Sequence, residues 1–262
     1  KNFYSWAKEF VTVTQKYFFN RQINCYDHAD KAKIDELTKH LFLSYSQEEA
    51  GFTEFVEEEV IYLRMMPTTY GLINKLRRDR LYLGKNGEEV LADTEVKLMN
   101  KCHQCFSGTV LTEDKKGIIF DRSKATFIRE HFAGQKIAIF YKFRAEAIML
   151  VSVFGINRLT SSPDAFNHND NLTFASQIQS GREGTNLSTA DALVMLNIDY
   201  AAVSYWQARA RMQVKDRAKK AKLYWIFAEN GIESKIYEAV SAKKDFTLSY
   251  FKKHFPSIKQ FV

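Results

Sequence analysis

A glycine-containing segment between two expected strands has the residue types needed to bind an anion. Residues 179–191 include Gly181 and Gly184, and apolar stretches precede and follow them. When such a loop lies at the carboxyl edge of a parallel strand, its backbone N–H groups can point toward a phosphate. Loops with two glycines occur in many folds, so this segment alone predicts a candidate anion site and no particular activity.

Arginines follow the second of these strands. Gln207, Arg209 and Arg211 lie on an expected helix, and Arg217 comes six residues after Arg211. A guanidinium can make two hydrogen bonds to the γ-phosphate of a nucleotide and stabilise the charge that develops during phosphoryl transfer. A solvated basic helix face is the alternative for these arginines, and a solvated loop is the alternative for the basic run at residues 215–222. The nearby glycine-containing segment favours phosphate chemistry.

The elements that must position these residues alternate between strand and helix. Short apolar runs predict buried strands, and longer segments with apolar residues at helical spacing predict helices. The expected strands are residues 136–141, 156–159, 174–180, 192–198 and 222–227, and the expected helices are residues 143–154, 202–213 and 231–242. This order predicts an α/β fold in which helices cover both faces of a parallel sheet.

The N-terminal part is expected to be mainly helical. Aromatic and aliphatic residues recur at helical spacing within residues 2–20, which predicts a helix there. Further helices are expected at residues 30–42, 68–82 and 93–107, with a strand within residues 54–66. A predicted β-hairpin at residues 108–120 marks a change of pattern. We therefore expect a mainly helical linker region over residues 1–107 and an α/β lobe over residues 108–262.

Four segments resemble the motifs of one protein family, in the family's order. They are residues 136–143 (the fourth motif), residues 180–187 with Ala190 and Asp191 (the fifth), Gln207 with Arg211 (the sixth), and residues 229–236 (the closing signature). Together they resemble the second lobe of superfamily-two helicases, and most closely that of the Swi/Snf-type DNA-dependent ATPases. The N-terminal region is only loosely similar to the family's connection between lobes.

The resemblance implies a C-terminal RecA-like lobe that acts on ATP and Mg²⁺ held mainly by a first lobe of the same protein. Arg211 and Arg217 would be catalytic, and Gly184 and Gln207 would join them in binding ATP. The implied partner is duplex DNA, read through its backbone. The implied contacts with nucleic acid are Tyr141, Lys142, Ser180, Arg182 and Thr185.

The sequence departs from the family pattern at two places. Val214 stands where the family has its second arginine, so the finger is left open between Arg211, Arg217 and, more weakly, Arg209. Asn197 stands where the family has an aspartate before the sixth motif.

First-lobe chemistry is absent from the sequence. No Gly-Lys-Ser or Gly-Lys-Thr tripeptide occurs that could form a phosphate-binding loop. Asp35 and Glu36 lie on an expected helix surface rather than after a buried strand. The chain begins without a methionine, which indicates a piece of a longer protein. We therefore expect this chain by itself to hydrolyse no ATP.

Composition agrees with an intracellular nucleic-acid binder. A formal net charge of +7 suits contact with phosphates. Three cysteines form no disulfide framework, which indicates a reducing compartment, cytoplasmic or nuclear. Cys102 and Cys105 are too few for a structural zinc site and lie on an expected helix, so no metal site is predicted. A non-catalytic α/β docking module for protein or nucleic acid is the alternative function; a nuclease would need clustered carboxylates that we do not find.

Overall fold

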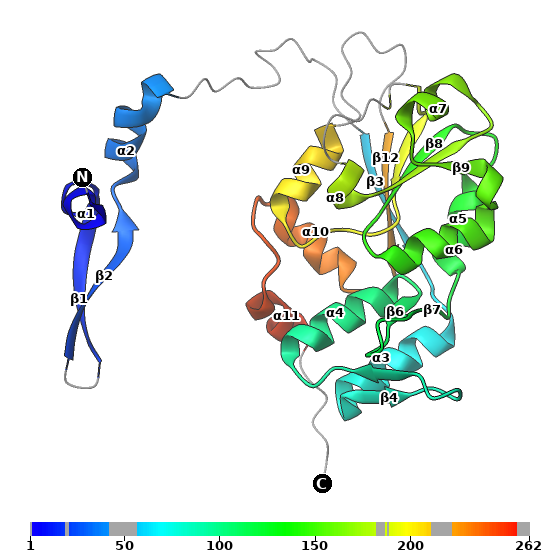
Figure 1. The fold of residues 1–262 in the computed structure, drawn as a ribbon, viewed down its shortest axis with the longest axis horizontal. Helices are drawn as coiled ribbons and strands as arrows, with labels where there is room; N and C mark the ends of the chain where they lie inside the picture. Colours follow the sequence, from blue (N-terminus) through cyan, green and yellow to red (C-terminus); the bar gives the residue numbers. More distant parts are fainter. Residues whose placement is uncertain are drawn as a thin grey trace. The chain divides into compact units, whose positions relative to one another are not determined.

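The computed structural model describes residues 2–18, 21–41, 57–181, 187, 189–210 and 222–255. The chain divides into two compact units, Lys1–Thr53 and Glu54–Val262, which we describe separately (Figure 1). No helix in the described part of the chain is both long and apolar enough to cross a bilayer.

The first unit contains a short helix, a β-hairpin and a second helix. Its elements are α1 (Phe3–Phe10), β1 (Val11–Phe18), β2 (Arg21–Ala29), α2 (Lys31–Thr38) and the 3₁₀ turn η1 (Lys39–Leu41). The expected helix over residues 2–20 is wrong beyond Phe10. Val11, Thr12, Val13 and Thr14 are β-branched and favour extended backbone, and antiparallel pairing with β2 satisfies their backbone groups.

The second unit contains a six-stranded sheet in the order β3-β12-β11-β8-β10-β9. Every neighbouring pair of its strands is parallel. The strands are β3 (Glu57–Leu63), β8 (Ile137–Tyr141), β9 (Leu159–Thr160), β10 (Thr173–Gln177), β11 (Ala192–Met195) and β12 (Lys222–Ala228). The central strands are continuous apolar runs, as expected when helices cover both faces of a sheet.

Successive residues of the strands point to opposite faces, and each face has its own hydrophobic core. Ala138 and Phe140 pack in one cluster, and Ile137 and Ile139 pack in the other. Helices α8 (Ile178–Gly181), α9 (Ala202–Ala210) and α10 (Glu233–Ser241) cover the first face, and α5 (Ser123–His131) and α6 (Arg144–Phe154) cover the second (Figure 1). The predicted α/β class with helices on both faces is confirmed, and the architecture is consistent with a RecA-like fold.

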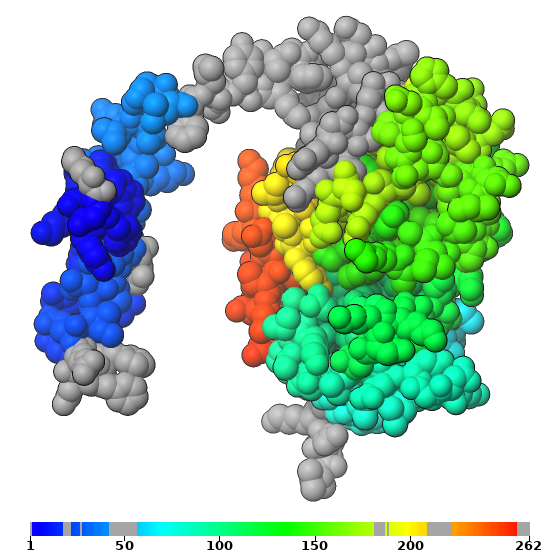
Figure 2. Space-filling view, in the orientation of Figure 1, coloured from blue at the N-terminus to red at the C-terminus, as the bar shows by residue number. Residues whose placement is uncertain are grey.

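Residues 64–122 form an insert between β3 and α5. Its elements are α3 (Pro67–Asp79), β4 (Leu81–Leu83), β5 (Glu89–Leu91), α4 (Glu95–Phe106), β6 (Thr109–Leu111) and β7 (Gly117–Ile119). The hairpin β6–β7 packs against α6, so the insert and the α6 layer form one continuous surface (Figure 2). The remaining elements are η2 (Ile156–Arg158), α7 (Pro163–His168) and α11 (Leu248–His254).

The compact units separate between Thr53 and Glu54, whereas the sequence pattern predicts a boundary between residues 107 and 108. Strand β3 explains the difference, because it pairs with β12 along its whole length, from Glu57 with Lys222 to Leu63 with Ala228. That pairing joins residues far apart in the sequence, whereas the change of pattern at residue 108 is only local.

Candidate nucleotide and nucleic-acid site

The strand order gives the sheet a topological switch point between β8 and β10. The chain leaves β8 through α6 on one face, and it leaves β10 through α8 on the opposite face. In open α/β sheets, ligands bind outside the carboxyl ends of the strands at such a point. Tyr141 pairs with Gln177 at these carboxyl ends, and the Gln177 side-chain amide donates to the Lys142 carbonyl over 2.7 Å. Three predicted nucleic-acid contacts, Tyr141, Lys142 and the exposed Ser180, therefore come from the elements that meet here.

Lys142 already has a partner within the protein. Its ammonium contacts the Asp199 carboxylate and lies 4.3 Å from the centre of the Tyr200 ring, with only 10% of its side chain exposed. Burial raises the pKa of Asp199, but the Lys142 charge and hydrogen bonds outweigh burial and leave that pKa lowered. A phosphate contact by Lys142 stays a prediction, and it would have to compete with Asp199.

A buried polar network holds the turn after β8. One oxygen of Glu146 accepts from the amides of Lys142 and Phe143 at 2.7 and 2.8 Å, and the other accepts from Asn197 at 2.6 Å. Asn197 Oδ1 lies 2.5 Å from His103 Nε2. Burial raises the pKa of Glu146, although these hydrogen bonds oppose the shift. The network connects the insert, the β8 turn and the carboxyl end of β11. Sequence reasoning missed Glu146 and His103, because Asn197, the partner that they share, lies 51 and 94 residues away along the chain.

The protein should lose stability as the pH falls, and His103 should carry part of that loss. Burial, and secondarily the Lys142 charge, hold the pKa of His103 well below its usual 6.5. The unfolded chain protonates this imidazole near pH 6.5, while the folded chain keeps it neutral. Stabilisation present above pH 6.5 is therefore lost as the pH falls, by at most about 1.4 kcal/mol per pH unit for one proton.

Urea unfolding between pH 7.5 and 5.0 measures this effect. His103→Gln should lower the pH dependence of the free energy of unfolding, whatever it does to stability at pH 7.5. His131→Gln is the matched control, since His131 is exposed and stacks on Phe127. Equal pH dependence in wild type and His103→Gln would contradict the assignment.

The described residues at the two ends of the predicted glycine-containing segment lie at opposite edges of the sheet. Helix α8 follows the carboxyl end of β10, and Asp191 directly precedes β11 at the amino edge. There the Asp191 amide donates to the Lys136 carbonyl over 2.7 Å, and the Lys136 amide donates to the Asp191 carboxylate over 2.8 Å. Arg182, Gly184 and Thr185 lie outside the described residues. The segment thus connects the end of α8 to the amino edge.

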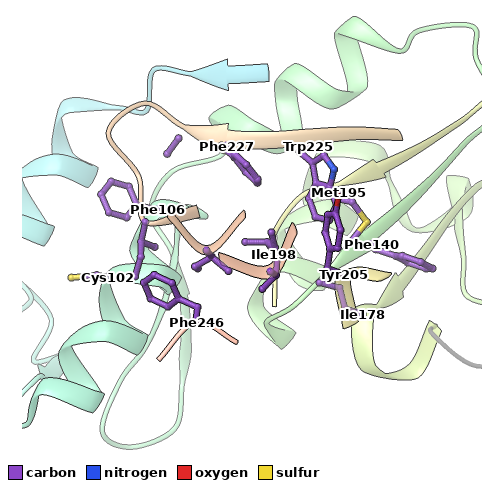
Figure 3. Packing of buried hydrophobic residues seen from close by; sticks show 14 of the residues in the cluster. Cys102, Phe106, Phe140, Ile178, Met195, Ile198, Tyr205, Trp225, Phe227 and Phe246 are labelled. Carbon is purple, nitrogen blue, oxygen red and sulfur yellow. The ribbon is translucent and has the colours of Figure 1, made fainter. Parts of the chain in front are cut away.

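Helix α9 precedes the cationic segment in the sequence. Helix α9 packs against α8, and Ile178, Tyr205 and Ala208 share one hydrophobic cluster (Figure 3). Ala210, the last residue of α9, directly precedes Arg211 in the sequence. Arg211 and Arg217 lie outside the described residues, which resume at the start of β12.

The described residues that flank the two segments are neighbours at both ends. The segments follow two helices that pack together, α8 and α9. The strands that follow them start side by side, because Ala192 of β11 pairs with Lys222 of β12. The described residues on either side of the candidate anion loop and of the candidate arginines are therefore neighbours in the lobe.

Gln207 is the predicted ATP contact that the structure describes. Its side-chain carbonyl oxygen is buried and accepts no hydrogen bond within the described part of the chain. A buried polar atom without a partner costs about 1–3 kcal/mol, so such atoms call for an explanation.

The two cysteines of α4 belong to the core. Cys102 and Cys105 are both fully buried, and burial raises the pKa of Cys102 to about 12 and that of Cys105 well above its usual value. Neither thiol is poised to ionise as a metal ligand. Within the described residues, no three His, Cys, Asp or Glu side chains are grouped to hold a metal ion.

Among known proteins, the chain shows only a weak structural likeness. No family model matches the chain, and no curated protein matches it. A solved structure described as the C-terminal part of the Fun30 ATPase domain is similar at 19% identity and a TM-score of 0.36. The match covers 48% of this chain and 44% of that one, less than half of either. A likeness this weak carries no argument about function, and the fold assignment rests on strand order, parallel pairing and helix layers.

Proposed function

We propose that residues 54–262 form the second lobe of a helicase-type ATPase that depends on nucleic acid. The observation that carries the proposal is that the described residues flanking the two candidate segments are neighbours: α8 packs against α9, and Ala192 of β11 pairs with Lys222 of β12. The order of the four motifs along the sequence supports the same interpretation.

The donor and acceptor groups near these segments fit a nucleoside triphosphate. Gln207 offers a buried acceptor without a donor in the described residues, and arginine is the side chain best suited to phosphate oxygens. Mg²⁺-ATP would supply the transferable phosphoryl group and would be held mainly by a first lobe of the same protein. Gly184 and Gln207 would orient the nucleotide, and Arg211 and Arg217 would stabilise charge on the transferring group.

Duplex DNA is the proposed partner of the lobe. Backbone contacts from Tyr141, Lys142, Ser180, Arg182 and Thr185 would carry little sequence specificity, because phosphates are common to all sequences. Opening and closing of two lobes around the nucleotide would move such contacts along one strand.

Arg182→Glu should weaken binding of this chain to a short duplex. Lys142 is paired with Asp199, so Arg182 is the predicted cationic contact without a described ion-pair partner to compete with the phosphate. Losing one phosphate contact makes the negative slope of log K against log salt shallower by about 0.9. Fluorescence anisotropy with a labelled duplex over a salt series measures both affinity and slope.

Lys85→Glu is the matched control, since it makes the same change of charge on the exposed turn between β4 and β5. Equal effects of the two substitutions would contradict the predicted contact and leave only general attraction by net charge. Retained DNA binding without DNA-stimulated ATP hydrolysis in the longer protein would favour the non-catalytic docking module.

A further inference from the structure

A single carboxylate near the amino end of the edge strand β3 accepts hydrogen bonds from three aromatic side chains. Glu58, the second residue of β3, accepts hydrogen bonds from Tyr205 Oη, Trp225 Nε1 and Tyr237 Oη, each at 3.1 Å. These donors come from α9, β12 and α10. Glu58 therefore ties the edge strand to its neighbouring strand and to two helices.

The aromatic rings around this carboxylate are closely packed. Tyr205 stacks on Trp225 with 5.4 Å between ring centres, and Tyr237 meets both rings edge-on at 5.7 and 5.6 Å. Trp225 is fully buried and Tyr205 is 5% exposed. Burial, and then the Glu58 charge, raise the pKa of Tyr205, so its hydroxyl remains a hydrogen-bond donor. A charged acceptor in this setting makes strong and directional hydrogen bonds.

Tyr205 lies close in the sequence to the residues predicted to bind ATP and to act as the arginine finger. It lies two residues before Gln207 and six before Arg211 on the chain. Near its beginning α9 is anchored by Ser204 Oγ, which donates to Asp199 at 2.8 Å, and by the Ala202 amide, which donates to Asp245 at 2.9 Å. The bond from Tyr205 to Glu58 adds an anchor from the edge strand, further along α9 toward the arginines.

We propose that Glu58 is a positioning residue for the arginine finger, acting through Tyr205 to set the orientation of α9. The inference rests on the proposed function, and it names an acidic residue outside the four motifs as necessary for that activity. Strand β3 directly follows residues 42–56, which connect the two compact units. Glu58 thus joins the incoming edge strand to the helix that leads to the finger.

The test uses a protein in which this chain is joined to the phosphate-binding lobe that the proposed function requires. Glu58→Gln should reduce kcat for DNA-stimulated ATP hydrolysis on the order of 10- to 100-fold, because a small displacement of a catalytic group costs about this much. KM for ATP and affinity for DNA should change less than about twofold, since ground-state contacts remain. Glu59→Gln is the matched control, because Glu59 is the next residue of β3 and is exposed.

Two tyrosine variants separate positioning from general core stability. Tyr205→Phe removes the hydroxyl of α9 and should reproduce the loss of kcat, whereas Tyr237→Phe removes that of α10 and should leave kcat within about twofold of wild type. Combining Glu58→Gln with Tyr205→Phe should give little more than either alone. These variants keep the proposal testable if Glu58→Gln fails to fold.

Equal losses of kcat in Tyr205→Phe and Tyr237→Phe, or an unchanged kcat in Tyr205→Phe, would overturn the positioning role. A wild-type protein without DNA-stimulated ATP hydrolysis would instead overturn the proposed function. The two failures are therefore distinguishable.

Discussion

Replacing Arg211 by alanine is expected to lower ATP turnover by about 10³- to 10⁵-fold in the protein that joins this chain to a phosphate-binding lobe. An arginine finger neutralises charge that develops in the transition state, so its loss falls mainly on kcat and much less on KM for ATP. Steady-state hydrolysis with saturating duplex DNA measures both constants. This chain alone, without that lobe, is expected to show no ATP hydrolysis and provides the baseline.

Three further variants make the assignment of the finger specific. Arg211→Lys should remain strongly impaired, because an ammonium cannot reproduce the two parallel hydrogen bonds of a guanidinium. Arg217→Ala tests the alternative finger, and Arg158→Ala is a control on an exposed arginine of η2. Unchanged turnover in both Arg211→Ala and Arg217→Ala would refute an arginine finger at these positions.

Lys124→Met is expected to destabilise the second unit by about 3–5 kcal/mol. Lys124 Nζ lies 2.6 Å from Glu233 Oε1 and 3.4 Å from the carbonyl oxygen of Leu196, and neither charged side chain is exposed. Removing the ammonium leaves a carboxylate buried without its charged partner. Chemical denaturation followed by far-UV circular dichroism measures the change in the free energy of unfolding.

The double variant Lys124→Met with Glu233→Gln should recover most of the lost stability. A neutral pair of similar volume avoids the cost of burying a lone charge. Lys253→Met is the control for the substitution itself at an exposed position. Similar losses in Lys124→Met and Lys253→Met would show that the buried pair contributes little.

This ion pair also explains one residue of the predicted closing signature. Glu233 begins α10 on one face of the sheet, and Lys124 lies in α5 on the other face. The pair joins the two helix layers near the carboxyl end of β11, where Leu196 follows the strand. The Glu233 carboxylate thus has a structural partner, and its place in the signature requires no contact with nucleotide.

The sequence by itself determined the elements whose signals are local. Apolar runs at residues 136–141, 192–198 and 222–227 predicted β8, β11 and β12, and the alternation with helices predicted a parallel sheet covered on both faces. Such strands need apolar residues on both faces, so a short segment is enough to identify them. The same local reasoning was wrong for residues 11–18, because apolar spacing outweighed four consecutive β-branched residues.

Only the tertiary structure decided which charged groups meet. Lys142 and Asp199 are 57 residues apart, Lys124 and Glu233 are 109 apart, and Glu58 lies 147 residues from Tyr205. Their contacts depend on strand order and on which face each helix covers, and neither leaves a periodic signal in the sequence. For that reason a lysine predicted from its motif to bind phosphate is paired with an aspartate, and an unremarked glutamate connects the edge strand to α9.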